Sequence, residues 1–201
     1  MTLDPFYLIV DSADWIVRLV PQGVKLVQLR VKDCEPEELR RQIRDAKAVC
    51  EAHGATLVLN DYWQMAIDEG CSWLHLGQED LAEADLPAIR RAGLKLGLST
   101  HDEAELETAL AAKPDYVALG PVYPTILKEM KWAPQGLERL GIWKKRIGAL
   151  PLIGIGGLTP ERAEAALAAG ADSAAVATDI TRNTDPEARV REWLAATARW
   201  R

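Results

Sequence analysis

Cysteine is scarce in this sequence, and its three cysteines, Cys34, Cys50 and Cys71, lack the paired spacing of metal ligands. An odd number of cysteines is typical of reduced thiols, so we expect a cytoplasmic protein. Basic residues are outnumbered, with 24 Lys and Arg against 30 Asp and Glu, which gives a net charge of −6. We therefore expect no nucleic-acid partner and no attraction to an anionic membrane, and any anion site must be local.

Long apolar runs are also missing. The N-terminal segment has no basic region, and Asp4 precedes only a short apolar run, so we expect no signal peptide. No stretch approaches the roughly 20 apolar residues of a membrane span. A chain of 201 residues with 48% hydrophobic residues can bury a full core, and we expect one domain covering residues 1–201.

Short β-type runs alternate with helical patterns along the whole chain. Eight strands that alternate with helices predict a parallel sheet closed as a single-domain (β/α)₈ TIM barrel, with an open doubly wound sheet as the alternative. The expected strands are 6–10, 26–30, 56–60, 73–77, 95–99, 116–119, 152–155 and 174–177.

The clearest helical pattern covers residues 36–53, where apolar residues form one stripe and Gly54 is expected to end the helix. Thr159 and Asp185 each precede a proline, which is typical of helix starts. Further helices are expected at 102–112, 137–147, 160–169 and 186–196. The segment 120–136, rich in Pro, Lys and Trp, is long enough to predict a functional loop.

The second strand carries the strongest chemical signal. Alternation along a strand places Gln28, Arg30 and Lys32 on one face and Leu29 and Val31 on the other. Two cations and an amide that point together indicate a phosphate or diphosphate site. A solvated face of an edge strand is the alternative.

Polar residues follow the other strands at the same rim, where barrels carry their sites. Asp61 and Asp80 follow adjacent strands, and two converging carboxylates suit Mg²⁺ bound with a substrate phosphate. Each Asp could instead be a helix N-cap. Asn60 could bind phosphate or close its turn.

The seventh strand ends in Gly154, Ile155, Gly156 and Gly157, where backbone N–H groups can approach an anion. His101 is a candidate general base, although a structural role at the start of a helix is the stronger interpretation. His75 and His53 are expected to be structural.

Seven motifs in order across nearly the whole chain resemble the thiamine phosphate synthase family. They are QLRVK at 28–32, NDYW at 60–63, HLGQED at 75–80, GLSTH at 97–101, PT at 124–125 with Lys128, APQG at 133–136 and GIGG at 154–157. The resemblance implies a (β/α)₈ enzyme that joins 4-amino-5-hydroxymethyl-2-methylpyrimidine diphosphate to a thiazole phosphate and releases pyrophosphate.

The resemblance also implies the roles of individual residues. Arg30, Lys32, Ser99 and Lys128 would be catalytic, and Asp61 and Asp80 would hold Mg²⁺. The pyrimidine diphosphate would contact Gln28, Leu29, Arg30, Val31, Lys32, Asn60, Ser99 and Lys128. The thiazole phosphate would contact Thr125, Ile126, Leu127, Gly156, Gly157, Ala177 and Thr178.

Two departures from the family pattern bear on the thiazole phosphate. Leu127 replaces a Thr, which removes a hydroxyl donor, and Asp179 either brings a carboxylate near the phosphate or turns away to cap the last helix. The alternatives to a synthase are a thiazole tautomerase on the same barrel and a paralogue that binds the diphosphate without turnover. The retained diphosphate residues argue against the tautomerase.

Overall fold

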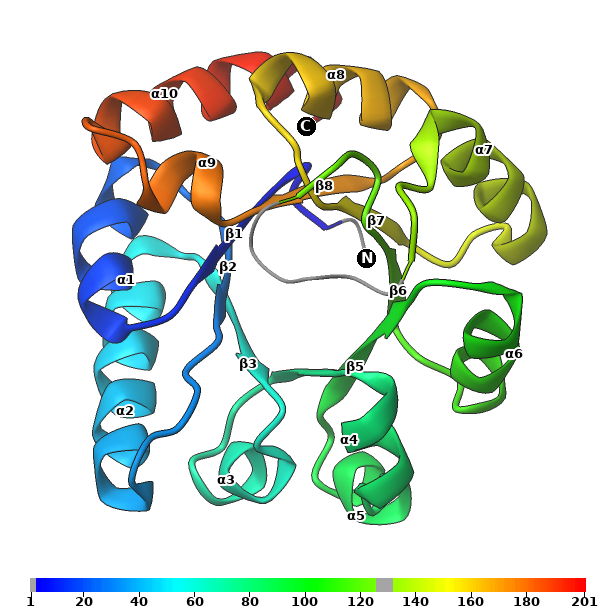
Figure 1. Cartoon of the computed structure of the whole chain (residues 1–201). Coiled ribbons are helices and arrows are strands. Elements are labelled where there is room, and N and C mark those ends of the chain that lie inside the picture. Colours follow the sequence, from blue (N-terminus) through cyan, green and yellow to red (C-terminus); the bar gives the residue numbers. More distant parts are fainter. Residues whose placement is uncertain (1–2, 126–131) are drawn as a thin grey trace.

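The eight strands form a closed parallel barrel with helices around it (Figure 1). The structure is a computed structural model that describes residues 3–125 and 132–201. Neighbouring strands pair in chain order, and β8 pairs with β1, so the predicted (β/α)₈ barrel is confirmed and the open sheet is wrong. The strands are β1 Phe6–Val10, β2 Leu26–Leu29, β3 Thr56–Asn60, β4 Trp73–Leu76, β5 Lys95–Thr100, β6 Tyr116–Leu119, β7 Leu152–Ile155 and β8 Ser173–Val176.

The strands bury side chains on both faces, as parallel strands between two layers must. Inward-facing residues fill the barrel with one apolar cluster that includes Tyr7, Trp73 and Tyr116. Outward-facing residues pack under the helices in a second, larger cluster, together with the fully buried Trp143 and Trp193. A side chain at Gly97 would collide with the barrel filling, because its Cβ would lie 1.9 Å from the ring of Tyr116.

The helices lie outside the barrel and cover the outward faces of the strands (Figure 1). Thr159 and Asp185 are N-caps whose side chains accept backbone N–H groups, and Gly54 ends the second helix with φ of 60°, as predicted. The helices are α1 Ala13–Leu19, α2 Pro36–His53, α3 Trp63–Asp68, α4 Gln78–Glu83, α5 Leu86–Arg91, α6 Glu103–Ala111, α7 Gly136–Ile147, α8 Pro160–Ala168, α9 Thr178–Thr181 and α10 Pro186–Thr197, with 3₁₀ turns at Val20–Gln22 and Ala198–Trp200.

Several predicted boundaries differ from the structure by one residue. β2 ends at Leu29 and β4 at Leu76, so Arg30 and Gly77 already belong to the rim. β5 continues to Thr100, and β8 covers 173–176, which leaves Ala177 after the strand. The helices α3, α4 and α9 have only four to six residues, which is too short for a periodic pattern to show them.

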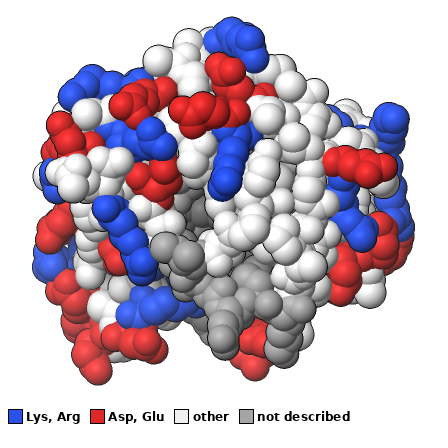
Figure 2. Space-filling model, turned by 45° about the horizontal axis from the view of Figure 1, so that its top comes forward, with Lys and Arg blue, Asp and Glu red and all other residues white. Residues whose placement is uncertain are grey.

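Acidic and basic side chains are interspersed on the face shown in Figure 2. This agrees with a sequence that carries no basic excess. Within residues 3–125 and 132–201, no helix is long and apolar enough to cross a membrane.

Candidate active site

The two expected metal ligands meet at the rim where β3 and β4 end. Asp61 directly follows β3, and Asp80 lies in the first turn of α4. Burial raises the pKa of the Asp80 carboxyl, and the charge of Asp61 and a hydrogen bond between the two carboxyls raise it further. The N-caps of α3 and α4 are Tyr62 and Gly77, so neither Asp is an N-cap.

This pair of carboxylates fits a divalent cation. When both carboxyls are ionised they repel each other, and a cation between them would relieve that repulsion. Asp61 also has φ of 68°, a left-handed backbone that costs free energy and is typical of functional positions. In the described part of the chain, no group of three or more His, Cys, Asp or Glu gathers. Mg²⁺ commonly takes one or two carboxylates together with substrate phosphate and water, and Asp61 and Asp80 could supply such a pair.

One cation, Lys32, lies beside the carboxylates, and a second, Arg30, follows β2 at the same rim. Lys32 forms an ion pair with Asp61, and Arg30 is exposed just after the end of β2, where its backbone N–H donates to Val10. The side chains of Leu29 and Val31 instead pack under the helices, so only their backbone groups can contact a ligand at the rim. The rim after β2 therefore carries both cations, and Lys32 pairs with one of the two carboxylates.

Gln28 opens a buried chain of hydrogen bonds across the barrel interior. Its amide nitrogen lies 2.9 Å from the Tyr7 hydroxyl, which lies 3.1 Å from the Tyr116 hydroxyl. That hydroxyl lies 2.8 Å from Nδ1 of His75, and Nε2 of His75 lies 2.7 Å from Oγ of Ser99. This chain of hydrogen bonds therefore links β2, β1, β6, β4 and β5, and it ends at Ser99, a predicted substrate contact.

The hydrogen-bond chain begins with a donor, because the Gln28 amide N–H donates to the Tyr7 hydroxyl. Either hydroxyl can donate in the bond between Tyr7 and Tyr116, and the tautomer of His75 sets the roles at its two nitrogens. In the tautomer that carries the proton on Nε2, His75 donates to Ser99. The hydroxyl proton of Ser99 is then left to donate to a ligand at the rim.

His75 is a structural member of this hydrogen-bond chain and does not act as a free base. Burial lowers its pKa to about 4; Asp61 opposes the change, and the nearby Arg30 adds to it. The imidazole is therefore neutral at pH 7, and both of its nitrogens are engaged. Asn60 ends β3 beside His75 in the strand register, and it is 4% exposed, so its amide faces the same interior.

The expected phosphate-binding turn lies on the other side of the rim. Gly156 and Gly157 both have positive φ, and a Cβ on Gly157 would lie 2.3 Å from the Pro124 carbonyl oxygen. This turn therefore packs against the segment that leads to Thr125. Ala177 is the N-cap of α9 and Thr178 is its first residue. Ile126, Leu127 and Lys128 lie outside the described residues.

Comparison with known proteins decides the family. The chain matches the thiamine monophosphate synthase family over residues 6–180. The chain belongs to this family. A thiamine-phosphate synthase from Rhizobium etli is 73% identical over 100% of this chain and 98% of its own length. One from Salmonella typhimurium is 48% identical over 94% of this chain and 90% of its own length.

Solved structures support the fold of this thiamine monophosphate synthase family member. A thiamine phosphate pyrophosphorylase from Pyrococcus furiosus superimposes with a TM-score of 0.86. The superposition covers 98% of this chain and 96% of that one, at 20% identity.

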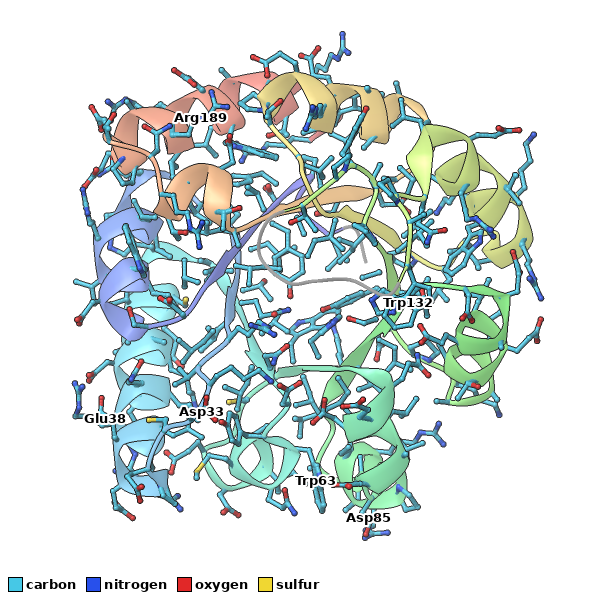
Figure 3. The ribbon with its side chains drawn as sticks, viewed as in Figure 1. Asp33, Glu38, Trp63, Asp85, Trp132 and Arg189 are labelled. Carbon is cyan, nitrogen blue, oxygen red and sulfur yellow. The ribbon has the colours of Figure 1, made fainter. Side chains whose placement is uncertain are left out.

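One departure from the thiamine monophosphate synthase pattern is explained by the structure. Asp179 accepts hydrogen bonds from Nε and Nη2 of Arg189 at 2.7 and 2.9 Å, and from the indole N–H of Trp193 at 2.8 Å. Both partners belong to α10 on the outside of the barrel (Figure 3). Its carboxylate therefore turns away from the rim, as the second interpretation expected, although it pairs with α10 and does not cap it.

His101 has a structural role, but not as a helix cap. Asp102 is the N-cap of α6, whereas the His101 ring stacks on Trp132 with centroids 4.1 Å apart, and its Nδ1 lies 2.7 Å from Glu105. The sequence interpretation missed Tyr7 and Tyr116 as members of the site, and it read His75 as structural without its link to Ser99. Strand alternation could have found them, since their parity places them on the inward face.

Proposed function

We propose that this rim catalyses the family reaction, in which a pyrimidinylmethyl diphosphate alkylates a thiazole phosphate and pyrophosphate leaves. The observation that carries the proposal is the contact between Asp61 and Asp80 beside Lys32 and Arg30, at the end of a chain that presents the Ser99 hydroxyl. Carboxylates and cations at one edge match a diphosphate held with a divalent cation. We propose that the whole chain of residues 1–201 acts as one barrel domain.

The diphosphate would be held by the residues that follow β2. Arg30 can bind two phosphate oxygens at once through its planar guanidinium, whereas Lys32 acts as a point charge. From β5, Ser99 can donate its hydroxyl proton when Nε2 of His75 donates to it, and Asn60 adds an amide. The predicted contact Lys128 belongs to the same proposal.

The pyrimidine would lie over the buried hydrogen-bond chain. The Gln28 amide that donates to Tyr7 also has an oxygen that can accept from the exocyclic amino group of an aminopyrimidine. An amino group of that kind stabilises a benzylic-type cation, so the diphosphate can leave before the thiazole nitrogen attacks. Such a path needs charge neutralisation and positioning more than a strong base. The engaged, neutral His75 fits that requirement.

Asp61 and Asp80 would hold Mg²⁺, and the ion, when bound, would neutralise the diphosphate charge as pyrophosphate departs. Lys32 would then exchange its contact with Asp61 for one with the diphosphate. On the other side of the rim, Thr125 and the backbone of Gly156, Gly157 and the Ala177–Thr178 step would hold the thiazole phosphate. The three free cysteines support a cytoplasmic location for this enzyme.

The test is a coupled assay with both substrates and Mg²⁺ that follows thiamine phosphate. The unaltered protein should form product, and EDTA should abolish it. Asp80→Asn should weaken binding of the pyrimidine diphosphate and lower turnover by about a hundredfold, at unchanged melting temperature. Glu79→Gln is the matched control, because Glu79 is an exposed carboxylate one residue away on α4.

Two outcomes would contradict the proposal. Diphosphate binding without product would identify a paralogue that has lost turnover. Binding and activity that are insensitive to both EDTA and Asp80→Asn would exclude these carboxylates as the metal site.

A further inference from the structure

The loops that follow β6 and β7 are joined beyond the ends of their strands. The register of the two strands ends with Leu119 opposite Gly154. The pairing then continues in the loops, because the N–H of Val122 donates to Ile155 at 2.8 Å and the N–H of Tyr123 donates to Gly156 at 3.0 Å. The segment 122–124 therefore lies directly against the turn at 155–157.

Arg162 closes this junction from the side. It lies in the first turn of α8, and its Nη1 donates to the carbonyl oxygen of Gly157 at 2.6 Å. Its guanidinium carbon also lies 4.6 Å from the ring centroid of Tyr123, which places the cation over the aromatic face. One side chain thus contacts both loops at once.

The position of this cation is electrostatically unfavourable unless an anion comes near. The N-terminus of a helix is already positive, so a cation in the first turn is repelled by the helix dipole. Within residues 3–125 and 132–201, no carboxylate lies within ion-pair distance of Arg162. Its neighbour Glu161 accepts instead from the Thr159 hydroxyl at 2.7 Å.

The flexibility of the two glycines explains what the Arg162–Gly157 hydrogen bond does. Gly156 and Gly157 have φ of 100° and 63°, and glycine populates many other backbone conformations at little cost. Contacts from outside the turn therefore have to fix the direction in which it presents its N–H groups. The Tyr123 N–H holds the Gly156 carbonyl, and the Arg162 side chain holds the Gly157 carbonyl.

We propose that Arg162 is a positioning residue for the phosphate of the thiazole substrate. By donating to the Gly157 carbonyl while its guanidinium lies over the Tyr123 ring, it fixes the direction of the backbone N–H groups of the glycine turn. Its unneutralised charge adds to the attraction for the phosphate. This inference rests on the proposed function, because it assigns the glycine turn to that substrate.

The experiment compares three variants in the coupled assay. Arg162→Ala should raise the KM for thiazole phosphate about tenfold, the lower end of the loss expected for one hydrogen bond from a charged donor. The KM for the pyrimidine diphosphate should stay within about twofold and the melting temperature within about 2 °C. Arg162→Lys keeps the charge but loses the planar guanidinium that stacks on Tyr123 and donates to Gly157. Its KM for thiazole phosphate should therefore lie between those of Arg162→Ala and the unaltered protein.

The matched control is Arg199→Ala. Arg199 also lies over an aromatic ring, 5.2 Å from the centroid of Trp200, and pairs with Glu164 at 3.6 Å. It lies in the last 3₁₀ turn and should leave both KM values unchanged.

Three results would overturn the inference: an unchanged thiazole-phosphate KM in Arg162→Ala, an equal rise of both KM values, or a fall in melting temperature that accounts for the lost activity. Failure of the proposed function looks different, because the unaltered protein would then form no product. Calorimetric titration of thiazole phosphate into the unaltered protein and into Arg162→Ala would still measure the contribution of Arg162.

Discussion

Removing the Asp179 carboxylate should destabilise the protein and leave thiazole-phosphate binding intact. Its oxygens accept three hydrogen bonds from α10, two from Arg189 and one from the indole of Trp193. The side chains of Asp179 and Arg189 are 20% and 19% exposed, and Trp193 is fully buried. The carboxylate therefore joins the short helix α9 to the outer layer.

The size of the effect follows from the groups left without a partner. A buried indole N–H without an acceptor costs about 1–3 kcal/mol. Arg189 keeps its second partner Glu192 and some solvent, so its loss adds only about 0.5–1 kcal/mol. We expect Asp179→Ala to lower the free energy of unfolding by about 3 kcal/mol. For a chain of this length that is a fall of about 6–12 °C in melting temperature.

Urea and thermal unfolding measure the loss, and the coupled assay measures the thiazole-phosphate KM. Asp179→Asn keeps an acceptor for the indole and should lose about half as much stability. Asp45→Ala is the surface control, since Asp45 pairs with Arg41 while 47% exposed and should cost less than about 0.5 kcal/mol. A thiazole-phosphate KM that falls tenfold in Asp179→Ala, with unfolding unchanged, would show that the carboxylate faces the substrate and refute this reasoning.

Arg30→Lys should lower kcat/KM by about tenfold to a hundredfold, because a point charge replaces a two-point contact with the diphosphate; an unaltered kcat/KM would place Arg30 outside the site. Tyr7→Phe should cost about 1–3 kcal/mol in urea unfolding, because the buried Gln28 amide loses its acceptor, whereas Tyr62→Phe on the half-buried Tyr62 should be near neutral. His75 should make stability fall with acid: its pKa is about 4 when folded and about 6.5 when unfolded, so the unfolded chain binds the extra proton and about 2 kcal/mol is lost between pH 8 and pH 5. His75→Gln should lose that part of the slope; an unchanged slope would mean that His75 titrates normally.

The barrel and the composition of its rim could be predicted from the sequence. Eight apolar runs alternate with helical patterns, and parallel strands that close into a barrel place all their C-terminal ends at one edge. That rule brings Asp61, Asp80 and Lys32 together although 48 residues separate Lys32 from Asp80, and the structure confirms their contact.

Contacts across the barrel and between outer helices could not be predicted. Alternation predicts that Gln28 and His75 point inward, but only the closed barrel shows that two tyrosines connect them. The direction of Asp179 depends on where α10 packs, which is fixed by Trp193 stacking on Phe6 at 5.4 Å. The short helices α3, α4 and α9 contain too few turns for periodicity to reveal them.

The close fit of Gly97 against Tyr116 limits how this sequence can change over evolutionary time. The space that a larger residue would need at position 97 is filled by the Tyr116 ring, and the Tyr116 hydroxyl is held by Tyr7 and His75. A substitution at 97 can therefore be accepted only in a lineage that has already shortened residue 116. Loss of that ring would in turn cut the path from Gln28 to Ser99. The two positions therefore constrain each other, and we expect position 97 to remain glycine for as long as Tyr116 keeps its place in the hydrogen-bond path.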